Sequence, residues 1–107
     1  MTSEANLDDY VVRNDDGTIT VPAATLTHIV VQSAESVDGA RVRRARRKVG
    51  VELDGRRARV ELELAVAYGK VLPEVAQDVQ LQVTEALTRM CGLDVAAVDV
   101  TVEELDR

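Results

Sequence analysis

Apolar residues recur at two spacings along the chain, and the change between them marks where strands and helices are expected. Residues 18–21 alternate polar and apolar positions, as a short strand does. Pro22 suits the first turn of a helix, where its missing N–H has no intrahelical partner. The following apolar positions have helical spacing and form one stripe: Ala23, Leu26, Ile29, Val30 and Ala34. Asp38-Gly39 ends this helix or turns the chain.

The middle of the chain predicts a β-hairpin. Residues 41–53 read as an extended segment, and Asp54-Gly55 supplies the residue types of a two-residue turn. With these two residues as the loop, Val51 faces Ala58 and Glu52 faces Arg57. The second arm then carries these apolar residues on its inner face: Val60, Leu62, Leu64, Val66 and Tyr68.

A second helix and a last strand complete the pattern. The helix begins at Pro73, has Glu74 near the positive end of its dipole and closes with Gly92. Its apolar stripe consists of Val75, Ala76, Val79, Val83, Ala86, Leu87 and Met90. Residues 95–105 alternate again and place Val98, Val100 and Val102 on one face of a strand.

The order of elements is therefore βαββαβ, with one apolar stripe on each helix and one apolar face on each strand. This predicts an α+β fold, a two-layer sandwich with two helices packed on one face of a mainly antiparallel sheet. A ferredoxin-like and a KH-like arrangement both satisfy this order. We expect residues 17–107 to form a single domain and residues 1–16, which are polar and acidic, to form a flexible tail.

Composition adds a setting for this fold. Only 2% of the 107 residues are aromatic, so Val, Leu, Ile and Ala must fill the core. A single cysteine forms no intrachain disulfide, and the first residues do not resemble a secretory signal, so a cytoplasmic location is expected. No apolar stretch approaches the roughly 20 residues of a membrane span. Membrane association would then be peripheral or through a partner.

The net charge of −6 is unevenly distributed. Residues 41–59 hold nine basic and two acidic side chains, a balance of +7, which leaves −13 for the rest of the chain. Six of the eight residues in the segment 41–48 are cationic. We take this basic segment as the candidate partner-binding surface, represented by Arg43, Arg44, Arg46 and Arg47.

Four interpretations of the basic segment stay open. Charges on an exposed edge strand prevent unwanted strand pairing, so the segment is equally well explained as a solvated edge. Arginines bind phosphates of nucleic acids, but no aromatic residue lies within the segment to stack on bases. An anionic membrane attracts basic residues by about 1 kcal/mol each, without a second anchor here. We favour contact with an acidic surface of another copy or another protein.

Residues with catalytic or metal-binding chemistry are sparse. His28 and Cys91 are the only residues of their kinds and lie far apart in sequence, so we expect no metal site. Glu61 and Glu63 share a strand face and could act as an acid–base pair, but a solvated charged row explains them better. We therefore expect no enzyme, no catalytic residue, no cofactor and no small-molecule substrate.

One part of the sequence resembles a known family. The motif consists of Tyr68-Gly69, Leu72-Pro73-Glu74-Val75-Ala76, Val79-Gln80 and Met90-Cys91-Gly92-Leu93. It is similar to the alkaline shock protein family of envelope stress response proteins, and the likeness extends over about residues 18–105. The resemblance implies a non-enzymatic interaction module in the bacterial cytoplasm, or one held at the inner face of the membrane by a membrane-anchored partner. The density of arginine in 41–48 exceeds what the resemblance implies.

The leading hypothesis is a scaffold or adaptor protein in the bacterial cell-envelope stress response. It would act by self-association, as a homo-oligomer, or by binding a membrane-anchored protein. The alternative is a KH-like RNA-binding module that uses the basic segment 41–48.

Overall fold

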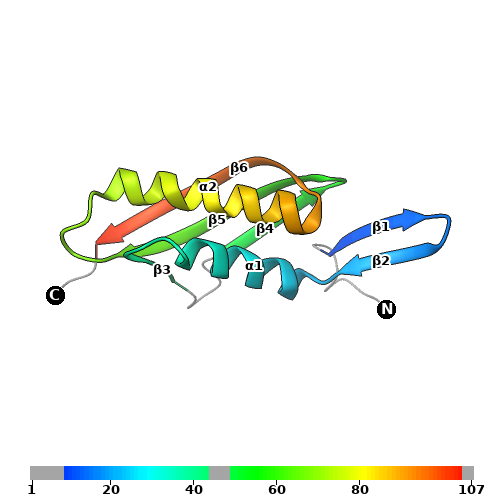
Figure 1. Ribbon diagram of the computed structural model, residues 1–107, viewed down its shortest axis with the longest axis horizontal. Coiled ribbons are helices and arrows are strands. Elements are labelled where there is room, and N and C mark those ends of the chain that lie inside the picture. Colours follow the sequence, from blue (N-terminus) through cyan, green and yellow to red (C-terminus); the bar gives the residue numbers. More distant parts are fainter. Residues whose placement is uncertain (1–8, 44–48, 105–107) are drawn as a thin grey trace.

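The computed structural model describes residues 9–43 and 49–104 of the chain. Its elements follow in this order: β1 (Tyr10–Asn14), β2 (Gly17–Val21), α1 (Ala23–Glu35), β3 (Ala40–Val42), β4 (Val49–Asp54), β5 (Arg57–Val66), α2 (Leu72–Cys91) and β6 (Asp94–Glu104). Both helices lie on the same face of the main sheet (Figure 1). The predicted two-layer α+β fold with a mainly antiparallel sheet is confirmed.

Strand β5 is the centre of the main sheet. Strand β6 pairs parallel with it over residues 57–66, and so occupies one whole edge of β5. Strands β4 and β3 pair antiparallel with β5, over residues 57–62 and 64–66 respectively. Because a strand has only two edges, β4 and β3 follow one another along the edge opposite β6. The single extended segment expected at 41–53 is thus two strands, and residues 44–48 between them lie outside the described residues.

The hairpin register differs from the prediction by two residues. The loop is Gly55-Arg56, not Asp54-Gly55. Gly55 takes a φ of 62°, which glycine adopts without a steric penalty. The expected oppositions are wrong, because Val51 faces Val60 and Glu52 faces Arg59. Side chains alternate between faces with a period of two, so a two-residue shift keeps the apolar residues on the helix side.

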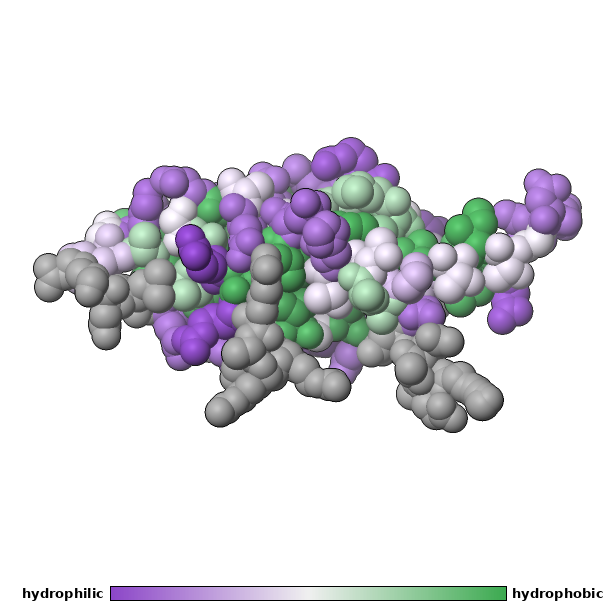
Figure 2. Space-filling model, turned by 90° about the horizontal axis from the view of Figure 1, so that it is seen from below, coloured by the Kyte–Doolittle hydropathy of each residue, from purple (hydrophilic) through white to green (hydrophobic). Residues whose placement is uncertain are grey.

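The N-terminal part of the chain forms a second, separate sheet. Strand β1 pairs antiparallel with β2 where we expected an unstructured tail up to residue 16, and that expectation is wrong for Tyr10–Asn14. The expected first strand belongs to this hairpin and not to the main sheet. The hairpin projects beyond the helices (Figure 1), and Figure 2 shows hydrophobic atoms on it. Its base is tied to the body, because Ala23 N donates to Asp9 Oδ1 at 2.6 Å and Tyr10 is buried.

The core lies between the helices and the main sheet. Its largest fully buried side chains are Leu26, Leu64, Leu87, Leu93, Val30, Val60, Val66, Val79 and Val83. Tyr68 and Met90, which we expected inside, are 59% and 63% exposed. Tyr68 follows the end of β5, and Met90 lies along an open hollow between α1 and α2, so neither is covered. Gly92 ends α2 with a φ of 69°, as the sequence predicted.

Candidate interaction surface

The face of the main sheet opposite the helices carries charges of both signs. Strand alternation directs the even-numbered residues of β5, from Ala58 to Val66, to the helices and the odd-numbered residues to the other face. No helix or strand among the described residues covers this face, which we call the outer face. Its exposed charged residues are Arg41, Arg43, Glu52, Asp54, Arg57, Arg59, Glu61, Asp94, Asp99 and Glu103.

Within residues 9–43 and 49–104, the ion pairs Arg59–Asp99 and Arg43–Glu103 link strands across the outer face. Arg59 Nη1 lies 3.0 Å from Asp99 Oδ2, and Arg43 is paired with Glu103. All four side chains are between 42% and 56% exposed. Exposed pairs of this kind contribute about 0–1 kcal/mol to stability, because water screens them and ordering long side chains costs entropy. They therefore set the orientation of the charges more than they hold the fold together.

The structure places only one of the predicted partner-binding residues. Arg43 ends the described part of the chain after β3, and its backbone N–H donates to the Glu63 carbonyl at 2.9 Å. Its guanidinium reaches across β5 to Glu103 on β6. Arg44, Arg46 and Arg47 lie outside the described residues. Arg43 is thus part of the charge network of the outer face, which the sequence did not reveal.

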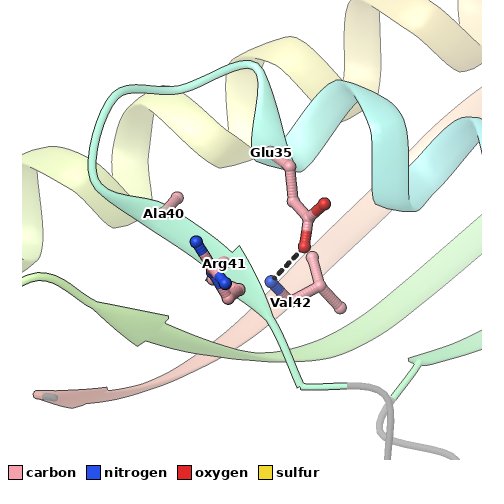
Figure 3. A pocket seen from close by; sticks show the side chains of 4 residues that line it. All are labelled: Glu35, Ala40, Arg41 and Val42. Atoms are coloured by element: carbon pink, nitrogen blue, oxygen red, sulfur yellow. Dashed lines mark hydrogen bonds between the residues drawn. The ribbon is translucent and has the colours of Figure 1, made fainter.

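Helix α1 closes the sheet edge at β3 (Figure 3). The backbone groups of Gly39 and Arg43 form hydrogen bonds with residues that flank or belong to β5. Because backbone groups point to alternate edges along a strand, the N–H of Val42 points away from β5. That N–H donates to Glu35 Oε2 at 2.9 Å, and Figure 3 shows Glu35 reaching down from the last turn of α1 to make this bond. The shallow hollow here is lined by Glu35, Ala40, Arg41 and Val42. A charged side chain bonded to an edge N–H keeps another strand from pairing there.

Helix α2 makes a corresponding contact with β6, the strand at the opposite edge. Gln80 Nε2 donates to the carbonyl of Val98 at 2.9 Å. Gln80 belongs to the motif that carries the family resemblance, and this contact gives it a structural role. The sequence singled out the residue but not its partner, because the pairing depends on where α2 lies over the sheet.

The residues considered for catalysis lie on three separate elements: His28 on α1, Glu61 and Glu63 on β5, and Cys91 at the end of α2. His28 and Glu61 are exposed, and Cys91 is half-buried on α2. Burial raises the pKa of the Cys91 thiol, so less of the reactive thiolate is present at neutral pH. Among residues 9–43 and 49–104, no three His, Cys, Asp or Glu side chains are grouped closely enough to hold a metal ion.

The apolar surface of the N-terminal hairpin was not predicted from the sequence. Ile19 is 55% exposed and Val11 41% exposed. The available signal was the apolar pair Val11 and Val12 ahead of the turn at Asp15-Asp16. The acidic residues on both sides of this apolar pair are typical of a tail, so the segment was not recognised as a strand.

Comparisons with known proteins agree with this fold. The model of the alkaline shock protein 23 family, described by a "cell envelope-related function", matches residues 41–107, more than half of the chain. No curated protein matches the chain. Among solved structures, a variant of MamM CTD in a zinc form has a TM-score of 0.62 at 18% identity, covering 78% of this chain and 87% of that one. Another MamM CTD variant, in a copper form, has a TM-score of 0.55 at 17% identity, with 78% and 98% covered.

At this identity the MamM CTD structures show a shared fold. No helix within the described residues has both the length and the apolar character needed to cross a bilayer. The family assignment rests on the sequence, through the matched region 41–107, which includes the motif at residues 68–80. The chain belongs to the alkaline shock protein family that its sequence resembles, a family described by a cell envelope-related function.

Proposed function

We propose that this protein is a non-enzymatic scaffold or adaptor in the bacterial cell-envelope stress response. It acts in the cytoplasm, or at the inner face of the membrane, through contacts with further copies of itself and with a membrane-anchored protein. The observation that carries the proposal is the outer face of the sheet, which is exposed and lined with charges of both signs. Membership of the alkaline shock protein family supports the envelope setting.

The outer face suits reversible protein contact. Its two cross-strand ion pairs are about half exposed, so a partner's charges can replace either member at little cost. Arg41 and Arg43 of the basic segment 41–48 lie on this face, and the other four cations of the segment follow them in the sequence. Complementary charge of this kind steers encounters and fixes the relative orientation of two proteins.

The test is a charge reversal that spares the fold. A triple variant carries Arg44→Glu, Arg46→Glu and Arg47→Glu, and leaves Arg43 in place because Arg43 pairs with Glu103. A control variant makes the same change of net charge at exposed positions away from the outer face: Arg13→Glu, Arg56→Glu and Arg89→Glu. Circular dichroism first establishes that both variants are folded.

Tagged wild type and both variants are then purified from the native host, and the co-purifying proteins are quantified. Removing one side of a desolvated charge contact costs about 2–5 kcal/mol, so the triple variant should lose its partners by roughly tenfold or more. The control variant should keep them. Partner recovery that is equal for the triple variant and wild type would overturn the proposal that the basic segment binds.

A further inference from the structure

Strand β2 (Gly17–Val21) has an outer edge that is exposed and uncharged, and no strand among the described residues pairs with it. The hairpin of β1 and β2 stands apart from the main sheet, and an isolated two-stranded hairpin is only marginally stable in water. Ile19 of β2 is 55% exposed (Figure 2 shows hydrophobic atoms on this hairpin). The hairpin thus offers both backbone groups and apolar surface to a further strand.

The register of the hairpin determines which backbone groups are available. The loop is Asp15-Asp16, so Asn14 and Gly17 exchange backbone hydrogen bonds, as the residues flanking a two-residue loop do. Backbone groups point to alternate edges along a strand, so the N–H and C=O groups of Ile19 also point toward β1. The N–H and C=O groups of Thr18 and Thr20 point away from β1, and both residues are exposed.

The edges of the main sheet at β3 and β6 carry protection that β2 lacks. At β3, the outward N–H of Val42 is bonded to Glu35 and that of Ala40 to the carbonyl of Val37. At β6, Gln80 bonds the backbone, and the strand is acidic. Natural proteins use such devices against strand pairing. In β2, four of five residues are β-branched and none is charged, which favours pairing.

We propose that β2 pairs antiparallel with β2 of a second copy of this chain, about a two-fold axis at Ile19. Thr18 then lies opposite Thr20 of the second copy, and the outward backbone groups of both threonines are bonded in each copy. Ile19 faces its own counterpart, and the two hairpins become one continuous sheet. This inference specifies the self-association within the proposed function and rests on it.

Side-chain chemistry supports this register. Ile19 and Val12 pair within one hairpin, and Tyr10 and Val21 lie on the same face, so the two-fold joins two apolar strips into one. Two chains with a net charge of −6 each meet through a segment that carries no charge. A register centred on Thr18 would instead place Thr20 opposite a residue of the acidic turn. The interface is small, so the dimer should form at high protein concentration and dissociate on dilution.

A disulfide test reads the register directly. In a Cys91→Ser background, Ile19→Cys places two cysteines at a pair that is not hydrogen-bonded, with Cα atoms about 4.5 Å apart. A disulfide accepts Cα separations of roughly 4.4–6.8 Å. Thr18→Cys is the first control, because in the proposed register residue 18 lies opposite residue 20 of the second copy and not opposite residue 18. Leu81→Cys on α2 is the second, since Leu81 has the same exposed fraction as Ile19.

We expect the Ile19→Cys protein to form a covalent dimer in a glutathione redox buffer at least about tenfold faster than either control. Equal rates at all three positions would overturn the proposal. Sedimentation velocity over a concentration series provides the second measurement. Wild type and Leu81→Lys should shift toward dimer with concentration, and Ile19→Lys should stay monomeric.

Two further outcomes separate this inference from the proposed function. If wild type self-associates and Ile19→Lys associates equally well, the β2 pairing is wrong and the scaffold role stands. If wild type is monomeric at every concentration, the β2 pairing is wrong, and the proposed function then depends only on capture of an envelope partner.

Discussion

The placement of helix α2 on the sheet predicts different costs for two leucines in the same helix. Leu87 is 0% exposed and Leu81 is 55% exposed. Leu→Ala removes the equivalent of three methylene groups, or about 2.4 kcal/mol of transfer free energy at about 0.8 kcal/mol each. The cavity left at a closed site raises the cost toward the roughly 2.7–5.0 kcal/mol seen for buried leucines. We expect Leu87→Ala to lower the free energy of unfolding by about 3 kcal/mol.

Leu81→Ala is the matched control, because it makes the same chemical change within the same helix. It should alter the free energy of unfolding by less than about 0.5 kcal/mol. The assay is urea unfolding followed by circular dichroism, and the two variants should also differ in melting temperature by roughly 10–20 °C. Equal losses for the two variants, or a larger loss for Leu81→Ala, would show that a different face of α2 packs on the sheet.

Three further predictions concern single contacts. Gly92→Ala should lower the free energy of unfolding by about 1–2 kcal/mol, because Gly92 has a φ of 69° that alanine adopts only with strain. Gly50→Ala is the control, because a Cβ at Gly50 also meets open space, and it should leave the free energy of unfolding nearly unchanged. Similar losses for the two variants would refute the role of Gly92 as the helix cap. Gln80→Glu removes the donor to the β6 carbonyl and should cost about 1–2 kcal/mol at pH 7, and an unchanged stability would contradict that bond. The hydrogen bond from Lys70 and its positive charge lower the pKa of Asp38, so this stabilisation is present above the pKa of unfolded aspartate and is lost as pH falls through the lowered pKa. Lys70→Gln should raise the Asp38 pKa in a carbon-13 NMR titration, and an unmoved pKa would refute the pairing.

Much of the fold could be predicted from periodicity. The spacing of apolar residues determines which face of a helix or strand is buried, but it does not determine which residues pair with one another. The stripe of α2 through Val79, Val83 and Leu87 was predicted and is buried. The β4–β5 register was wrong by two residues, since a two-residue shift leaves every face unchanged and only the turn geometry distinguishes the two. Sheet order stayed open because it depends on contacts between segments far apart in sequence.

The candidate site was less predictable than the fold. The density of arginine identified the basic segment, but the pairing of Arg43 with Glu103 arises only when β5 and β6 run in parallel. The bond of Glu35 to an edge N–H depends on how the chain turns back after α1, which the sequence pattern does not indicate. The pairing potential of β2 became visible only once β1 was seen beside it. These features depend on tertiary arrangement, which local pattern does not encode.

The proposed scaffold works through protein contacts at the cell envelope. The most direct measurement is purification of the wild-type protein from its native host, with and without nuclease, followed by identification of the molecules that remain bound. We predict membrane-protein partners whose recovery is unaffected by nuclease. Recovery of RNA alone, lost on nuclease treatment, would contradict the scaffold role and favour the nucleic-acid interpretation of the basic segment 41–48.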